Sequence, residues 1–474
     1  MIPGHRFRAR SLAAAATSLL VACATGLFGP ATLGADSLDD SLRRFVEQPE
    51  FARATWGVSV QDADTGRVRF ETNGHRLLKP ASNAKLFTGA LALHALGPRF
   101  HLSTDLVPTG PVSPQGTLHG DLLVRGFGDF SLADRFPVSG STSAIHRVVQ
   151  LMRAAGLRRI DGDLVADDSW FRGPSYGSGW TADDRLYDYG AEVSALSLND
   201  NVLALEIAPG AAEGDSVRVA ATEGTSYFRI EARGLVTSKP GTVRTLRVRR
   251  GENPRHLEIS GALPVGSEPW KELVPVPEPA RFFVHCLREA LIEAGIRVQG
   301  KARRATDATG VPVPRGGAPA PISVVSPPLA DLVAGMMKPS QNLYAQLLLL
   351  QVGARSRHAA NPSAPALDTE EAGILALRDF VEEAGLPVSE VRLDDGSGLS
   401  RSSLVTPAAI VALLRYMDRH PLRDAFLATL PVAGRDGTLR RRLVGTPLEG
   451  NLRAKTGSLR YVHTLSGFLV HPSG

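Results

Sequence analysis

The strongest constraint on this chain is a change in its local sequence pattern, which divides it into three stretches. Helical patterns rich in alanine and leucine occupy both ends, whereas residues 101–317 alternate short strand patterns with Gly, Pro and Asp turns. A chain of 474 residues also exceeds what one ordinary hydrophobic core contains. We therefore expect a helix-rich domain built from both ends of the chain, interrupted by a β-rich insertion of about 200 residues.

Periodicity and turn signals predict the individual elements. Helices are expected over residues 37–53, 83–96, 143–156, 281–295, 329–337, 341–353, 369–385 and 407–420. Strand pairs are expected over residues 55–72, and over residues 451–458 and 462–471 near the end. We assign residues 36–99 and 318–474 to the interrupted domain and residues 100–317 to the insertion.

The first 35 residues have the pattern of an export signal. Basic residues within the first ten positions precede an apolar run, residues 11–21, that is too short to span a bilayer. Cleavage after Ala35 would release an exported protein into the periplasm or another extracytoplasmic space. The alternative is a lipoprotein box ending at Cys23, whose lipid would associate the protein with a membrane. We favour cleavage after Ala35, because a second apolar stretch follows Cys23.

Composition excludes several classes of protein. A hydrophobic content of 43% and a charged content of 21% are those of a globular chain, not a disordered one. The net charge is +5, but the basic residues are spread along the chain, so we expect no nucleic-acid partner. Only Cys23 and Cys286 are cysteines, which excludes a disulfide framework, and the amphipathic pattern around Cys286 predicts a core position. The histidines show no metal-binding spacing.

The first chemical motif has the sequence Ser-Asn-Ala-Lys at residues 82–85, where a predicted helix begins. Three residues are nearly one helical turn, so Ser82 and Lys85 project on the same face. A neutral lysine amine can take the proton of a serine hydroxyl and make it a nucleophile. The pair alone is weak, since such spacing occurs by chance, but the chain has only seven lysines and uses arginine elsewhere. A lysine here indicates a position that needs a deprotonatable amine.

Two further motifs supply complementary groups. Residues 340–342, Ser-Gln-Asn, offer a second serine that can relay a proton, and Asn342 can hold a substrate carbonyl and orient the lysine. Residues 455–458, Lys-Thr-Gly-Ser, offer a lysine and a threonine that can bind a carboxylate. Taken singly, Ser340 would be explained as a helix cap and Lys455 as protection of an edge strand. Together, in this order, they are typical of enzymes that form an acyl-serine.

With these motifs, the chain resembles the D-alanyl-D-alanine carboxypeptidase/endopeptidase family, the penicillin-binding protein 4 type of the low-molecular-mass class C penicillin-binding proteins. Other matching stretches lie at residues 78–82, 160–164, 180–196, 395–401 and 430–439. The long gap between Ser82 and Ser340 is also typical of that family. The resemblance implies an α/β (α+β) fold: a serine β-lactamase/transpeptidase-like domain of helices around an antiparallel sheet, with a large β-rich insertion in two subdomains.

The resemblance also implies roles for the motif residues. Ser82 would form the acyl-enzyme and Lys85 would be its general base, while Ser340 and Asn342 would shuttle protons and hold substrate. Water would then release the acyl group without a metal or organic cofactor. The substrates would be D-Ala-D-Ala ends or D-alanyl cross-links of peptidoglycan stem peptides, and β-lactams would be inhibitors.

Substrate recognition is implied for a second group of residues. Lys455 and Thr456 would bind the C-terminal carboxylate, and the backbone N–H groups of Ser82 and Ser458 would form the oxyanion hole. The insertion would help to recognise the diaminopimelate end of the stem peptide. Asp184 and Arg401 resemble the acidic and basic residues that the family places there.

Two departures from the family pattern affect these expectations. Arg460 stands where some members have a neutral polar residue, so side-chain specificity is expected to differ. The sequence ends at Gly474, whereas relatives continue with at least another strand and a helix, so we expect the second part of the domain to be truncated, with an uncovered sheet edge.

Two other functions remain open at this point. The same nucleophile could serve a β-lactamase or an esterase, although β-lactamases have their first two motifs closer together. A non-catalytic penicillin-sensing, wall-binding protein would belong to a different class, and the intact motifs argue against it. Rapid turnover of bound penicillin would distinguish the first alternative from a D,D-peptidase.

Overall fold

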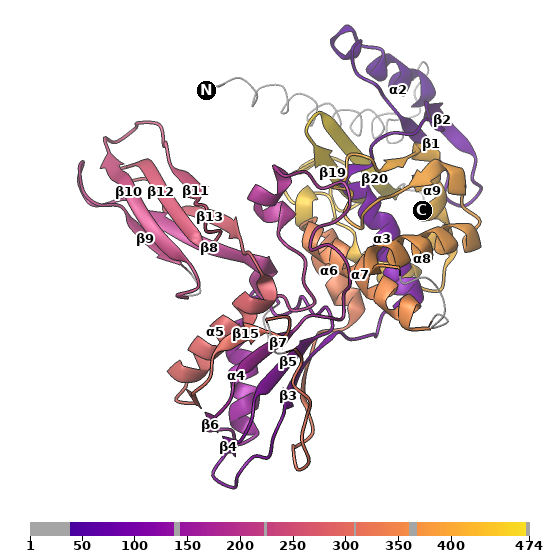
Figure 1. Ribbon diagram of the computed structural model, residues 1–474. Helices are drawn as coiled ribbons and strands as arrows, with labels where there is room; N and C mark the ends of the chain where they lie inside the picture. Colours follow the sequence, from indigo (N-terminus) through magenta and orange to yellow (C-terminus); the bar gives the residue numbers. More distant parts are fainter. Residues whose placement is uncertain (1–37, 137–142, 222–224, 308–309, 360–366, 471–474) are drawn as a thin grey trace. The chain divides into compact units, whose positions relative to one another are not determined.

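The computed structural model describes residues 38–136, 143–221, 225–307, 310–359 and 367–470. The export signal predicted over residues 1–35, including Cys23, lies outside this part of the chain. The chain forms two compact units (Figure 1). Within the described part of the chain, unit 1 consists of the residues that fall in Met1–His101, Gly177–Trp180 and Pro327–Gly474, and unit 2 of those in Leu102–Tyr176 and Thr181–Ser326.

Unit 1 is built around a helix that is apolar on every side. In α3 (Ala84–Leu96), all residues from 84 to 93 are buried. A helix of this composition must lie inside a domain. It packs against α6 (Leu329–Met337), α7 (Asn342–Ala359) and α8 (Thr369–Glu383). The start of α3, and the 3-10 turn η2 (Ala81–Asn83) before it, are therefore held in the interior of the unit.

One further helix of unit 1 begins at a side-chain cap. α9 (Pro407–Arg419) begins with proline, and the Thr406 side chain accepts a hydrogen bond from the Ala409 amide. α10 (Arg423–Thr429) follows α9, and α2 (Leu38–Val46) precedes the strands. None of the helices in the described ranges combines the length and apolarity needed to cross a bilayer.

The strands of unit 1 form three separate pairs, all antiparallel. β1 (Val58–Gln61) pairs with β2 (Val68–Thr72), and β17 (Val391–Arg392) pairs with β18 (Leu404–Val405). β19 (Leu452–Leu459) and β20 (Val462–Leu469) form a hairpin. Its register sets the third motif of the sequence opposite residues 463–466 of β20.

Unit 2 contains a five-stranded sheet with two helices. The strand order is β15 (Ala302–Arg304), β7 (Leu164–Asp167), β5 (Leu122–Gly126), β3 (Ser103–Pro108) and β16 (Ile322–Val325). The helices are α4 (Ala144–Ala154) and α5 (Pro279–Glu293), and a small three-stranded sheet consists of β14 (Arg297–Val298), β6 (Arg159–Ile160) and β4 (Thr117–Leu118). β5, β7 and β15 run parallel, and β3 and β16 extend the sheet antiparallel.

Two three-stranded sheets make up the rest of unit 2. One has the order β10 (Arg229–Ser238), β12 (His256–Pro264), β11 (Arg247–Arg250), and the other β13 (Trp270–Pro275), β8 (Val202–Ala208), β9 (Arg218–Ala221). Side chains alternate along these strands, so that Leu203 and Leu205 of β8 and Leu257 and Ile259 of β12 are buried in the same core.

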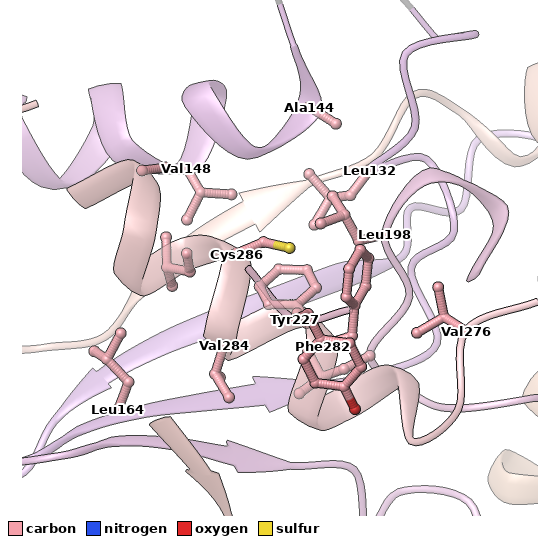
Figure 2. Close-up of a cluster of buried hydrophobic side chains, with 14 of the residues drawn as sticks. Leu132, Ala144, Val148, Leu164, Leu198, Tyr227, Val276, Phe282, Val284 and Cys286 are labelled. Carbon is pink, nitrogen blue, oxygen red and sulfur yellow. The ribbon is translucent and has the colours of Figure 1, made fainter. Parts of the chain in front are cut away.

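The core of unit 2 is continuous from the five-stranded sheet to these two sheets. Figure 2 shows Cys286 of α5 among apolar side chains, with the rings of Tyr227 and Phe282 nearby. Those two rings meet edge to face, with their centroids 5.2 Å apart. The interior position predicted for Cys286 is therefore observed.

Several element boundaries differ from the prediction. α7 extends to Ala359, six residues past the predicted end at Gly353. A Cβ on Gly353 would lie 2.1 Å from the Thr369 carbonyl oxygen, so this glycine permits close packing of α7 on α8 and does not end the helix. α2 ends at Val46, not at residue 53, because Pro49 restricts the preceding residues. α10 was not predicted.

The division between the units also differs from the predicted one. The sequence assigned residues 100–317 to the insertion, whereas unit 2 continues to Ser326. The reason is β16, which pairs with β3 of unit 2. In addition, Gly177–Trp180 belongs to unit 1, although the residues on both sides of it in the sequence belong to unit 2.

Candidate active site

The turn that contains Ser82 is tied to β20. The Pro80 carbonyl accepts a hydrogen bond from Thr464 Oγ1 at 3.0 Å. Asn83 Nδ2 donates to Ser466 Oγ at 2.7 Å. Because these contacts lie on either side of Ser82, its backbone is fixed relative to the β19–β20 hairpin.

Lys85 lies one turn further along and is fully buried. Its Nζ lies 2.9 Å from Ser82 Oγ, 2.7 Å from Asn342 Oδ1 and 2.8 Å from the Ser397 carbonyl oxygen. Burial lowers the pKa of Lys85 from its usual 10.5 to about 7, against the opposing effect of the Asp395 carboxylate. The amine can therefore be neutral at physiological pH and take a proton from Ser82.

The second motif lies between α6 and α7. Ser340 has a left-handed φ of +68°, a strained conformation for a residue with a side chain. Its Oγ accepts a hydrogen bond from Lys455 Nζ at 2.8 Å. Asn342 is the first residue of α7, and its side-chain oxygen accepts from Lys85. The motif thus connects the two lysines of the site.

Lys455 of β19 is the second fully buried lysine of the site. Its Nζ donates to Ser340 Oγ and, at 2.6 Å, to the Thr456 carbonyl. Burial lowers its pKa well below the usual 10.5, and the nearby Lys85 adds to this effect. Two buried amines in one site repel each other when both are protonated, so the cluster favours at most one of the two charges.

Gly457 allows β19 to approach the nucleophile closely. A Cβ on this residue would lie 2.8 Å from the Ser82 backbone nitrogen and 2.2 Å from Thr464 Oγ1. Any side chain would therefore separate the strand from the turn. The close approach brings the backbone of the third motif next to Ser82.

Thr456 and Ser458 complete the third motif. Thr456 Oγ1 donates to Thr438 Oγ1 at 2.7 Å. Ser458 is exposed and lies opposite His463 in the hairpin register, with Oγ 3.4 Å from His463 Nδ1. Burial lowers the pKa of His463, and the positive charge of Arg442 lowers it further.

The arrangement can therefore perform acyl transfer. The Ser82 hydroxyl, a possible nucleophile, lies within hydrogen-bond distance of the Lys85 amine, a possible base. The Ser340 hydroxyl accepts a hydrogen bond from Lys455, and both lysines are buried away from water. The combination suits a substrate that has both a reactive carbonyl and a nearby carboxylate, since an anion beside Lys455 favours the protonated form of its amine.

The structure brings together the residues of all three motifs, and the two proposed specificity residues belong to different units. Asp184 lies in unit 2, where its carboxylate accepts hydrogen bonds from the amide and hydroxyl of Thr181, at 2.8 and 2.7 Å. Arg401 lies in unit 1 and is exposed.

Three residues that the structure bonds to the motif residues, directly or through a turn, were not selected from the sequence: Asp395, Ser397 and Thr438. Ser397 acts through its backbone carbonyl, which no residue-type pattern reveals. Asp395 organises that carbonyl from two residues earlier. The available signal was the Asp-Gly-Ser-Gly turn pattern at residues 395–398, to which we assigned no role.

A groove of about 2700 Å³ in unit 1 lies elsewhere. Its walls include β1, α9 and β20, and it has Asn83 but neither Ser82 nor Lys85 in its lining. Hydrogen-bond geometry locates the candidate site better than volume does, because Lys85 contacts Ser82 and Asn342, and Lys455 contacts Ser340. Within the described residues, no three His, Cys, Asp or Glu side chains lie together as metal ligands would.

Comparison with curated proteins finds relatives along most of the chain. The D-alanyl-D-alanine carboxypeptidase of Actinomadura sp. (strain R39) is 32% identical over 448 residues, covering 92% of this chain and 79% of that protein. The D-alanyl-D-alanine carboxypeptidase DacB of Haemophilus influenzae is 28% identical over 425 residues, covering 88% of this chain and 83% of that protein.

Solved structures agree with these relatives. Penicillin binding protein 4 (dacB) from Haemophilus influenzae matches with a TM-score of 0.72 and 28% identity, covering 88% of this chain and 87% of that chain. This likeness confirms the predicted α+β class, a transpeptidase-like domain with an insertion. The sequence model of the D-Ala-D-Ala carboxypeptidase 3 (S13) family matches residues 38–474. The chain therefore belongs to the D-Ala-D-Ala carboxypeptidase 3 (S13) family and is a serine D,D-peptidase.

Proposed function

We propose that Ser82 of this D,D-peptidase attacks D-Ala-D-Ala bonds, or D-alanyl cross-links, of peptidoglycan stem peptides and forms an acyl-enzyme. The single observation that carries the proposal is the Lys85 amine, 2.9 Å from Ser82 Oγ and held by two further acceptors. The family and the names of the relatives support the substrate class.

Acylation begins with proton transfer from Ser82 Oγ to the neutral Lys85 Nζ. Ser82 Oγ then bonds to the carbonyl carbon of the penultimate D-alanine, and the carbonyl electrons move onto its oxygen. When the tetrahedral intermediate collapses, the C–N bond breaks and the amine of the terminal D-alanine leaves with the proton that Lys85 had taken, relayed through Ser340 Oγ, so that Lys85 is neutral again. Water then attacks the carbonyl carbon of the ester by the same steps in reverse order, and the bond to Ser82 Oγ breaks, which regenerates Ser82.

Lys455 and Thr456 bind the C-terminal carboxylate of the substrate in this mechanism. An incoming carboxylate favours the protonated form of Lys455, whose pKa is lowered by burial in the free protein. A proton on Lys455 in turn disfavours one on Lys85, because the two buried amines repel each other. Substrate binding therefore helps to keep the Lys85 base neutral.

The oxyanion hole consists of the backbone N–H groups of Ser82 and Ser458. The absence of a side chain at Gly457, which lets β19 approach Ser82, supports this assignment. Such donors stabilise a tetrahedral oxyanion by roughly 3 kcal/mol each.

β-Lactams inhibit this enzyme by the same route, because they combine an acylating amide with a carboxylate. A second structure of the Haemophilus influenzae protein, complexed with a novel β-lactam, matches with a TM-score of 0.65 and 26% identity over 88% of this chain. Slow hydrolysis of the penicilloyl-Ser82 ester distinguishes this enzyme from a β-lactamase.

The proposal extends to the substrate specificity of the enzyme and to the compartment in which it acts. Asp184 and Arg401 recognise the charged end of the stem peptide, and Arg460 modifies side-chain preference. The enzyme acts outside the cytoplasm after export directed by residues 1–35, where peptidoglycan is accessible. Acylation and hydrolysis at Ser82 require no metal or organic cofactor.

Release of D-alanine from a diacetyl-L-Lys-D-Ala-D-Ala peptide tests the proposal. The parent protein should release D-alanine, and Ser82→Ala should release none above background. Equal release by both proteins would refute the assignment of the nucleophile. Cross-linked muropeptides, analysed by mass, then separate endopeptidase from carboxypeptidase activity through their products, and an inert but penicillin-labelled parent would favour a sensing protein.

A further inference from the structure

We propose that Asp395 is a positioning residue for the Lys85 base: its buried carboxylate holds the Ser397 carbonyl against the amine, and Trp180 holds the carboxylate. The proposal rests on the function given to Ser82 and Lys85 above. It assigns a role to two residues that lie outside the three motifs and do not touch the reacting atoms.

The partners of Lys85 Nζ determine the direction of its lone pair. A neutral amine has two N–H groups and one lone pair. Nζ has three partners: Ser82 Oγ, the Asn342 side-chain oxygen and the Ser397 carbonyl. The last two cannot donate a proton, so they must take the two N–H groups. The lone pair is then directed at Ser82 Oγ, as proton abstraction requires.

The Asp395 carboxylate fixes the position of the Ser397 carbonyl. The Asp395 side chain is fully buried and accepts hydrogen bonds from the turn that follows it. Oδ2 accepts from the amide and hydroxyl of Ser397 and from the Leu399 amide, and Oδ1 accepts from the Gly398 amide. One carboxylate therefore determines the backbone of the whole turn, including the carbonyl that contacts Lys85.

The turn also fits against the nucleophile. Gly398 has a φ of +76°, and a Cβ there would lie 1.9 Å from the Ala81 carbonyl oxygen. Ala81 immediately precedes Ser82 and itself has a left-handed φ of +46°. A shift of the turn would therefore move both the base and the backbone beside the nucleophile.

Trp180 supplies the remaining contact of the carboxylate. Its indole Nε1 donates to Asp395 Oδ2 at 2.9 Å, and the ring is buried. The same short segment, Gly177–Trp180, is anchored through Ser178, whose amide and hydroxyl donate to the Glu370 carboxylate. A segment with no catalytic motif is thus bonded to the residue that arranges the base.

Charge provides a second way for Asp395 to act. The titratable groups around Lys85 are Asp395 on the turn and Lys455 on β19, with Glu370 of α8 beyond Asp395. Asp395 opposes the effect of burial and so raises the pKa of Lys85. A residue that only supported the fold would not move the pH dependence of acylation, whereas this carboxylate should.

The test is the acylation rate of the full chain with a fluorescent penicillin, measured as a function of pH. The parent should show a rise with a midpoint near pH 7, the pKa of Lys85. Asp395→Asn removes the negative charge, so its midpoint should move to lower pH, and its plateau should fall about tenfold or more as the carbonyl shifts. The matched control is Asp394→Asn, because Asp394 bonds to Ser400 Oγ and not to this turn; its profile should overlay that of the parent.

Trp180→Phe keeps an aromatic ring but removes the N–H donor to Asp395. This variant tests the proposal if Asp395→Asn does not fold. The carboxylate charge is then less neutralised, so the midpoint should move slightly to higher pH. Melting temperatures identify loss of fold. Midpoints equal to that of the parent in the folded variants would overturn the proposal, even if the rates fall. A parent that is not labelled at all would instead refute the function proposed for Ser82.

Discussion

Gly457 on β19 and Ser82 before α3 approach so closely that a Cβ on the glycine would lie 2.8 Å from the serine nitrogen. This contact joins two segments that are more than 370 residues apart in the sequence. It explains why the third motif contains a glycine at this position, since the proposed mechanism requires the strand and Ser82 to contact the same substrate.

Gly457→Ala should therefore reduce acylation of Ser82 by about 100-fold, because a displacement of about 1 Å in a catalytic geometry has effects of this size. The rate of labelling by a fluorescent penicillin measures it. Gly316→Ala is the control, since a Cβ at Gly316 meets open space. Labelling of Gly457→Ala at the parent rate would contradict the close contact.

Burial of Lys85 should make stability depend on pH. The pKa of Lys85 is about 7 in the folded protein and 10.5 as an ordinary lysine, so between these values the unfolded chain binds a proton that the folded protein does not. The free energy of unfolding should therefore rise with pH across this window, by an amount on the order of 4 kcal/mol.

Urea unfolding of the parent and of Lys85→Met at pH 7 and pH 10 measures this contribution as a difference. The parent should gain stability relative to the variant at the higher pH. Parallel pH dependences of the two proteins would show that Lys85 is protonated in both states.

Ser340 combines the hydroxyl that we propose as a proton relay with backbone strain, and two substitutions separate these properties. Ser340→Ala and Ser340→Gly both remove the hydroxyl and should lower peptide hydrolysis about 100-fold. Glycine also relieves the left-handed φ of +68°, so Ser340→Gly should be more stable than Ser340→Ala by about 1 kcal/mol. Denaturant titration measures this difference, and equal stabilities would contradict the strained conformation.

Thr438 should influence carboxylate binding through Thr456. The Thr456 hydroxyl donates to Thr438 Oγ1, which fixes its orientation. Thr438→Val should raise the KM for a D-Ala-D-Ala peptide several-fold, about 1 kcal/mol in binding, with a smaller change in kcat. A substrate amidated at its C-terminus is the control, and an equal rise in KM for that amide would show that Thr438 acts elsewhere.

Local sequence patterns predicted a helix well where each residue at its ends had only one structural interpretation. α6 has the predicted bounds, Leu329–Met337. Glycine has two meanings: it ends some helices, but Gly353 continues α7 because it allows α8 to pack closely. The extent of the insertion depended on β16, whose partner β3 is about 220 residues away in the sequence, so no local pattern could assign it.

The site was predicted as far as side-chain chemistry shows in the sequence. Ser82, Lys85, Ser340 and Lys455 were selected because hydroxyls and scarce lysines occur in recognisable motifs. The structure pairs Ser82 with Lys85 and Ser340 with Lys455 by hydrogen bonds. Asp395 was not predicted, because it acts on a backbone carbonyl through a turn. That role depends on tertiary contacts, including the hydrogen bond from Trp180, 215 residues earlier.

Mass spectrometry of the penicillin-treated protein tests the central claim most directly. One penicilloyl group should be found per molecule, on the tryptic peptide that spans residues 77–85 and contains Ser82. The modification should be absent from Ser82→Ala and should form faster as the pH is raised through about 7, where Lys85 loses its proton. A penicilloyl group on any other peptide, or none on a folded parent, would contradict the account.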